Sequence, residues 1–340
     1  MLFIEGKAGS GKSTLTRFFR DTLVSDRRNP KSEIVADFFY SARDGKLHQS
    51  HEMMLRSLLY HILETNESCF VHFQETYRNL PQPDSESRIK WPYESLKEIL
   101  RKCSKQLRSK LILVVDALDE SDDGDRRDIV ELLWNLAERK DGNCVKICLT
   151  SRPIIGLPKS FYSDPRCYHL KLQEKNKQDI EKYTQSFLGN LHLTFKGIAE
   201  AKKYIIDHAE GVFVWVHLIE KDLKYHSENG CSQEELMGIL KKLPTSLEKY
   251  YESMLRELKD NKEPYIEYGK RILQFCLFSQ RPIGLAELHQ ALAIPSNKLQ
   301  GFTATLDYLE HNMSGNIYAL VTKAVGHFIE IKKIPKYDST

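Results

Sequence analysis

The residues best suited to chemistry lie at the start of the chain. Residues 6–13 read GKAGSGKS, which fits the pattern G-x-x-x-x-G-K-[ST] in full. Glycines let the backbone turn around phosphate groups so that successive N–H groups point at the anion, and a following helix adds its positive N-terminus. In such a loop Lys12 would contact the β- and γ-phosphates of a nucleotide, and the hydroxyl of Ser13 would be a ligand of Mg²⁺. We therefore predict a phosphate-binding site formed by Gly6, Lys7, Ala8, Gly9, Ser10, Gly11, Lys12, Ser13 and Thr14.

A second group of candidate residues is acidic and follows the apolar run LILVV. This run leads into Asp116, and Asp119 and Glu120 come shortly after it. A carboxylate at the tip of a buried strand beside a phosphate loop can hold Mg²⁺ or one of its waters, and we assign this role to Asp116. A further acid can orient or deprotonate an attacking water. We predict Glu120 for this role and keep Asp119 as the alternative, because the sequence does not show which side chain points inward.

A third candidate is Arg152, within LTSRP at 149–153. An arginine that emerges from the strand beside the Mg²⁺-binding one could sense or neutralise a γ-phosphate. A lone arginine is more often a surface or ion-pair residue. The placement of Arg152 at the end of an apolar run favours the sensing role.

These residues need a sheet to hold them, and the hydrophobic pattern predicts one. We expect strands at 2–5, 33–41, 110–116, 144–150 and 167–172, and helices at 11–24, 51–64, 93–107 and 126–139. Nearly continuous apolar strands separated by helices indicate a parallel sheet that is covered on both faces.

After about residue 175 the strand pattern fades and helical segments follow. They are expected at 177–188, 195–208, 212–224, 234–240, 246–258, 265–278, 285–293 and 303–309. The tail IYALVTKAVGHFIEIKK contains two short β-prone pieces, which could complete a winged-helix unit. Phe213 and Trp215 are interpreted as core residues of a buried helix. We expect three domains, at 1–174, 175–262 and 263–340, the last one incomplete.

The composition excludes several classes of protein. Of 340 residues 41% are hydrophobic, which is enough for real cores and excludes a disordered chain. Fifty Lys and Arg against 47 Asp and Glu leave a charge of +3, which does not indicate a nucleic-acid or anionic-membrane surface. Seven scattered cysteines predict no disulfide framework and favour a reducing compartment. With no long apolar run or signal peptide, we expect a cytoplasmic protein.

Together, GKAGSGKST, LILVVDALDE and CLTSRP resemble the NACHT branch of the STAND P-loop NTPases, especially the fungal type with a nephrocystin-like NTPase domain. The stretches FFYSARDGKLHQS, QDIEKY, GVFVWVHLI and ILQFCLFSQRPIGLAELHQALAI agree, so the resemblance extends over nearly the whole chain. It implies an α/β P-loop NTPase fold followed by a helical domain and a partial winged-helix-like domain. Because the strand before the loop is so short, we expect a fragment of a larger protein.

The resemblance also implies a function. Proteins of this kind are signal-transduction switches that close over ADP, open when ATP replaces it, and then assemble. It implies ATP/ADP and Mg²⁺ as cofactors, slow hydrolysis, and protein partners that include further copies of the chain, with no membrane contact and no nucleic acid. The alternatives are a DNA-associated AAA-type ATPase, which usually has a polar Asn where this chain has Ser151 and Arg152, and a scaffold that binds nucleotide without hydrolysing it.

Overall fold

The structure, a computed structural model, describes most of the chain. The described residues are 1–25, 33–80, 91–137, 145–154, 162–191, 193–260, 265–294, 313–325, 329 and 331. The helix expected at 303–309 lies outside them. The chain divides into two units, Met1–Leu243 and Pro244–Thr340, and each is described by itself.

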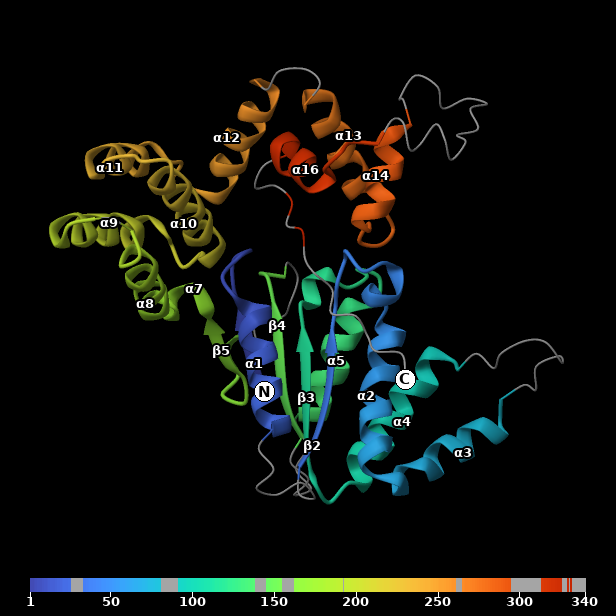
Figure 1. The fold of residues 1–340 in the computed structure, drawn as a ribbon. Helices are drawn as coiled ribbons and strands as arrows, with labels where there is room; N and C mark the ends of the chain where they lie inside the picture. Colours follow the sequence, from blue (N-terminus) through green and yellow to red (C-terminus); the bar gives the residue numbers. More distant parts are fainter. Residues whose placement is uncertain are drawn as a thin grey trace. The chain divides into compact units, whose positions relative to one another are not determined.

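The first unit is built around a five-stranded sheet with the order β2-β3-β4-β1-β5. All neighbouring strands pair in parallel, as the apolar pattern predicts. In Figure 1 the strands therefore point toward the same edge of the sheet. The strands are β1 (Leu2–Glu5), β2 (Glu33–Phe39), β3 (Lys110–Asp116), β4 (Val145–Ser151) and β5 (Tyr168–Lys171).

Both faces of the sheet are buried under helices. In β3, successive side chains alternate between two cores, as the pleat requires. Leu113 packs in the larger core with residues of α2 (His51–Thr65), α4 (Tyr93–Gln106) and α5 (Arg126–Ala137). Val114 packs in the smaller core on the other face, against Phe19 and Leu23 of α1, which spans Lys12–Ser25. The predicted α/β class is confirmed.

The sheet unit also contains short helices near its loops and a group of helices after β5. The short ones are η1 (Lys46–Gln49), η2 (Glu67–Cys69), α3 (Phe70–Arg78), η3 (Leu118–Glu120) and α7 (Leu172–Lys175). The helical group is α8 (Lys177–Leu188), α9 (Phe195–His208), α10 (Phe213–Glu228) and α11 (Gln233–Lys242). Trp215 of α10 is 1% exposed, as expected for a core residue. The helical character predicted after residue 175 is confirmed.

The regular secondary structure that is described in the second unit is all helical. Its helices are α12 (Leu247–Asp260), α13 (Tyr265–Phe278), α14 (Leu285–Ala293) and α16 (Ile317–Val325). Helices α13, α14 and α16 share a core that includes Ile272, Leu288 and Val321. Within the described ranges no helix is long and apolar enough to cross a membrane.

The first β-prone piece of the tail was wrongly predicted, because residues 317–325 form α16. Ile317, Leu320, Val321 and Ala324 recur at the spacing of one helical face, and all four pack in the core of the second unit. Tertiary packing of that stripe outweighs the β-propensity of the individual residues. The three-domain division at 1–174, 175–262 and 263–340 stays a prediction.

Candidate functional site

The predicted phosphate loop connects β1 to α1 and is held by backbone hydrogen bonds within the loop and to β4. The Gly6 N–H donates to the carbonyl of Ser151 on β4 at 3.1 Å, and the Ser10 N–H donates to the carbonyl of Lys7 at 3.2 Å. Gly9 has φ of +72° and Gly11 has φ of +93°, a region that side chains with a Cβ rarely adopt. The loop therefore needs glycine at these positions to turn into α1.

Lys12 lies at the first position of α1, and its side chain folds back so that the ammonium group contacts the loop. The Nζ atom donates to the carbonyls of Gly6 at 2.8 Å and Lys7 at 3.1 Å. Burial lowers the pKa of Lys12, and the charge of Arg152 lowers it further, whereas nearby carboxylates oppose the shift. An amine that is partly desolvated among carbonyls is a stronger partner for a phosphate than one in open water.

Asp116, at the end of β3, is held by Thr150 of β4. The Thr150 hydroxyl donates to Asp116 Oδ1 and accepts from the Ala117 N–H at 3.1 Å. Asp116 is 2% exposed and Thr150 is 0% exposed. Ala117 has φ of 54° and ψ of 48°, the left-handed region, which is strained for alanine. One threonine thus fixes both the carboxylate and the strained turn behind it, a role that we did not assign from the sequence.

Asp119 and Glu120, the two candidate bases, have different partners. Asp119 Oδ1 accepts from the Arg152 N–H at 2.8 Å and the Ser151 hydroxyl at 3.2 Å, and Oδ2 pairs with Arg152 Nε at 3.2 Å. Both oxygens of Asp119 are therefore engaged by the end of β4. Glu120 Oε2 accepts from the Ala42 N–H at 2.9 Å, in the segment after β2. These contacts favour Glu120 over Asp119 as the residue that acts on a water.

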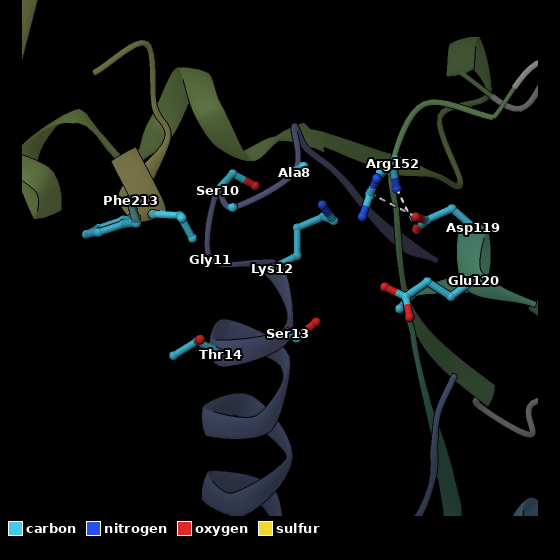
Figure 2. A pocket seen from close by; sticks show the side chains of 13 residues that line it. Ala8, Ser10, Gly11, Lys12, Ser13, Thr14, Asp119, Glu120, Arg152 and Phe213 are labelled. Carbon is cyan, nitrogen blue, oxygen red and sulfur yellow. Dashed lines mark hydrogen bonds and ion pairs between the residues drawn. The ribbon is translucent and has the colours of Figure 1, made fainter. Parts of the chain in front are cut away.

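A cavity of about 290 Å³ lies over the phosphate loop. Figure 2 shows Lys12 and Ser13 between two groups, with Phe213 on one side and Arg152, Asp119 and Glu120 on the other. The lining residues are Ala8, Gly9, Ser10, Gly11, Lys12, Ser13, Thr14, Ala117, Asp119, Glu120, Arg152, Phe213 and Val214. Most of the predicted site residues are thus brought together, whereas Gly6, Lys7 and Asp116 lie outside this lining.

Phe213, which we predicted as a core residue, instead begins α10 and lines the cavity. The same prediction is correct for Trp215, which is buried. The Phe213 ring also packs against Tyr183 of α8 with the ring centroids 6.3 Å apart. The sequence gives a helix at this position but no sign that its first turn lies beside a loop some 200 residues earlier.

A further set of contacts holds the acidic loop in place. The His51 Nε2 donates to the carbonyl of Asp122 at 2.9 Å, which leaves Nδ1 to accept from the Tyr40 hydroxyl at 2.7 Å. Burial lowers the pKa of His51, which favours this neutral form. Arg126 donates to the Ser121 hydroxyl at 3.0 Å and to the carbonyl of Asp119 at 3.2 Å. The backbone that carries the candidate base is therefore fixed from two sides.

The residues present fit a nucleotide and Mg²⁺. Ser10 Oγ is buried without a hydrogen-bond partner in the loop, and Lys12 and Arg152 supply positive charge to the same cavity. No cluster of three or more His, Cys, Asp or Glu side chains occurs in the described ranges. Mg²⁺ needs no such cluster, because it commonly binds through one or two protein oxygens together with phosphates and waters. Ser13 and Asp116 are the side chains that would serve it.

Comparisons with known proteins agree with the motifs. Residues 1–152 match the family described as Nephrocystin 3, N-terminal. The chain is 24% identical over 308 residues to the vegetative incompatibility protein HET-E-1 of Podospora anserina, a match that covers 87% of this chain and 22% of that protein. The chain thus spans about a fifth of the length of this relative. The resemblance to NACHT and nephrocystin-like NTPases is confirmed, and the fold is that of a P-loop NTPase.

Solved structures of origin-recognition proteins are similar only at a distance. The Aeropyrum pernix ORC2 protein in its ADP form has a TM-score of 0.37 and 12% identity, and the match covers 91% of this chain and 78% of that one. The Aeropyrum pernix ORC1 protein in complex with DNA has a TM-score of 0.39 and 13% identity, with 92% and 75% covered. At such TM-scores the likeness says nothing of function.

Proposed function

We propose that the chain is a Mg²⁺-dependent switch that binds ATP and ADP, hydrolyses ATP slowly, and acts through nucleotide-controlled conformational change and assembly. One observation carries this proposal. The cavity over the phosphate loop is lined both by groups suited to phosphates and by the first turn of a helix, α10, that lies far along the chain. A bound nucleotide would therefore touch the sheet and the helical segment at once.

The first part of the proposal concerns binding. Lys12 would contact the β- and γ-phosphates, while the N–H groups of the loop and of α1 would surround them. Ser13 would ligate Mg²⁺, and Asp116, held by Thr150, would hold the ion or one of its waters. Bound Mg²⁺ would neutralise charge on the phosphates.

Arg152 would respond to the presence of the γ-phosphate. Arg152 is paired with Asp119 through both its backbone N–H and its side chain. Its side chain is 54% exposed at the cavity, so the guanidinium can exchange this partner for an anion without moving through the core. Such a choice between two anionic partners is a two-state element that ATP and ADP would bias differently.

The third part concerns hydrolysis. Glu120 would act as the base, because Asp119 is engaged at both oxygens. The N–H of Ala42 donates to Glu120 and holds its carboxylate at the cavity. Slow turnover suits a switch in which the bound nucleotide sets the state.

The proposal of assembly and signalling rests on the resemblance of the sequence motifs to NACHT-type NTPases. We propose protein partners that include a second copy of this chain, and we expect no specific binding of DNA. A DNA-associated ATPase would instead show an affinity for duplex DNA that falls steeply with salt.

The test compares Lys12→Ala with Lys46→Ala, a lysine in η1 that does not line the cavity. Calorimetry with Mg·ATP and Mg·ADP should detect binding to the wild type and to Lys46→Ala but none to Lys12→Ala. Light scattering coupled to size exclusion should detect larger assemblies with ATP than with ADP. Equal affinity of Lys12→Ala and wild type would refute the phosphate site, and assemblies independent of nucleotide would refute the switch.

A further inference from the structure

The side chain of Asn176 joins two segments that are far apart in the sequence. Asn176 lies directly before α8 and is 3% exposed. Its Nδ2 donates to the carbonyl of Ser10 in the phosphate loop at 3.2 Å and to the carbonyl of Gly211, just before α10, at 2.8 Å. Because both partners are carbonyl oxygens, which only accept, the amide nitrogen must face them. One amide group thus ties the phosphate loop to the start of α10.

Asn176 does not make the capping hydrogen bond that an asparagine before a helix usually makes. Asn176 is the N-cap residue of α8, where asparagine is favoured because its side-chain oxygen accepts from free N–H groups of the first turn. Here the side chain makes no capping hydrogen bond, and its Oδ1 is buried without a partner. A local capping role therefore does not account for the orientation of the side chain.

Other contacts also join the phosphate loop to the start of α10, and we call this region the junction. The Val214 N–H, in the first turn of α10, donates to the carbonyl of Gly9 at 3.1 Å. A Cβ on Gly9 would lie 2.9 Å from the Val214 side chain, so the loop and the helix are in direct packing contact. Lys7 and Glu210 form an exposed ion pair at 2.6 Å. Asn176 adds a third segment and donates to both of the others from a buried position.

We propose that Asn176 is a positioning residue that couples the phosphate loop to α10, so that the two become ordered or loosened together. The shared amide means that neither carbonyl can shift without losing a hydrogen bond, and holding the Ser10 carbonyl keeps the adjacent peptide groups of the loop oriented for a phosphate. This proposal deepens the switch function and rests on it, since it names the route by which the phosphate loop acts on the helical segment.

The test is Asn176→Asp, which keeps the shape of the side chain but removes its donors. Aspartate is as good an N-cap as asparagine and is favoured by the helix dipole, so a capping role predicts an equal or more stable α8. The coupling role predicts that the contact between the phosphate loop and α10 becomes less stable, because a carboxylate would face two carbonyl oxygens. Asn66→Asp is the matched control, since the Asn66 Oδ1 caps η2 by accepting from the Ser68 N–H and aspartate retains that oxygen.

Hydrogen exchange of the nucleotide-free protein, read by mass spectrometry, gives the first result. In Asn176→Asp, amides of the phosphate loop and of the first turns of α10 should both exchange about tenfold faster, a factor that corresponds to about 1.4 kcal/mol. Amides within α8 and all amides of Asn66→Asp should exchange at the wild-type rate. Unchanged exchange in both junction segments, or faster exchange in α8 alone, would overturn the proposal.

Adding Mg·ADP gives the second result and separates the two proposals. In the wild type, ADP should slow exchange in the loop and in α10, whereas in Asn176→Asp saturating ADP should slow α10 by less, because only its direct contact with the nucleotide remains. A wild type that binds no nucleotide would refute the proposed function, while the nucleotide-free exchange would still decide the coupling. If Asn176→Asp does not fold, Asn176→Ala removes the same donors without placing a charge beside the two carbonyls. Faster exchange in both the loop and the first turns of α10 would then support the coupling, and unchanged exchange in both would overturn it.

Discussion

Thr150→Val is the most informative single change in the sheet, because valine has the shape of threonine without its hydroxyl. The Thr150 hydroxyl donates to the Asp116 carboxylate and accepts from the Ala117 N–H, and Thr150 is fully buried. A hydrogen bond to a charged group is worth about 1.5–3 kcal/mol, and a buried N–H left without a partner costs about 1–3 kcal/mol. The additional buried methyl group returns about 0.8 kcal/mol. We expect the free energy of unfolding to fall by about 2–5 kcal/mol.

Thr150→Ser is the matched control, because serine keeps the hydroxyl and loses only a buried methyl group, worth about 1 kcal/mol. Urea unfolding followed by the fluorescence of the sheet unit measures both variants. Mg²⁺-dependent nucleotide affinity should weaken in Thr150→Val and be nearly unchanged in Thr150→Ser, because Asp116 loses its fixed orientation only in the former. Equal stability of the two variants would refute the assignment of Thr150 as the residue that holds the carboxylate and the left-handed turn.

The remaining predictions concern catalysis, close packing and pH. Glu120→Gln should keep ATP affinity but slow hydrolysis by about 100-fold or more, and a larger loss in Asp119→Asn would reverse the base assignment. Gly211→Ala should destabilise the protein more than Gly230→Ala: both have positive φ, but a Cβ at 211 would lie 2.4 Å from a backbone oxygen and one at 230 would meet nothing within 4 Å, so equal stability would contradict the close approach. Burial holds the folded-state pKa of His51 below 6.5, so unfolding takes up a proton as the pH falls below 6.5. Stability should then decrease over that window in the wild type and less in His51→Gln, and identical pH profiles would contradict the buried neutral imidazole.

The sequence predicted those parts of the site that are contiguous in the chain. The phosphate loop is one motif, and its strand and helix follow from local hydrophobic pattern. Asp116 and Arg152 were assigned because each follows an apolar run that had to be a strand. Residues 317–325 were predicted as β-prone because the β-propensity of their side chains competes with a helical stripe. Packing against α13 and α14 decides in favour of the helix.

The remaining site residues depend on contacts between distant segments, which a single sequence does not reveal. Thr150 lies inside a recognised motif, but its two hydrogen bonds exist only because β3 and β4 are neighbours. Phe213 and Asn176 join the site through the fold of the helical segment around the loop. The proposed choice of Glu120 over Asp119 likewise rests on the position of Arg152.

The most direct test of the account is to ask which nucleotide the purified protein carries. Wild type and Lys12→Ala would be purified in parallel and denatured, and the released nucleotide would be identified and quantified by chromatography against protein concentration. We predict near-stoichiometric ADP from the wild type and none from Lys12→Ala. A wild type that releases no nucleotide and also fails to bind added Mg·ATP would contradict the claim that this loop is a working nucleotide site.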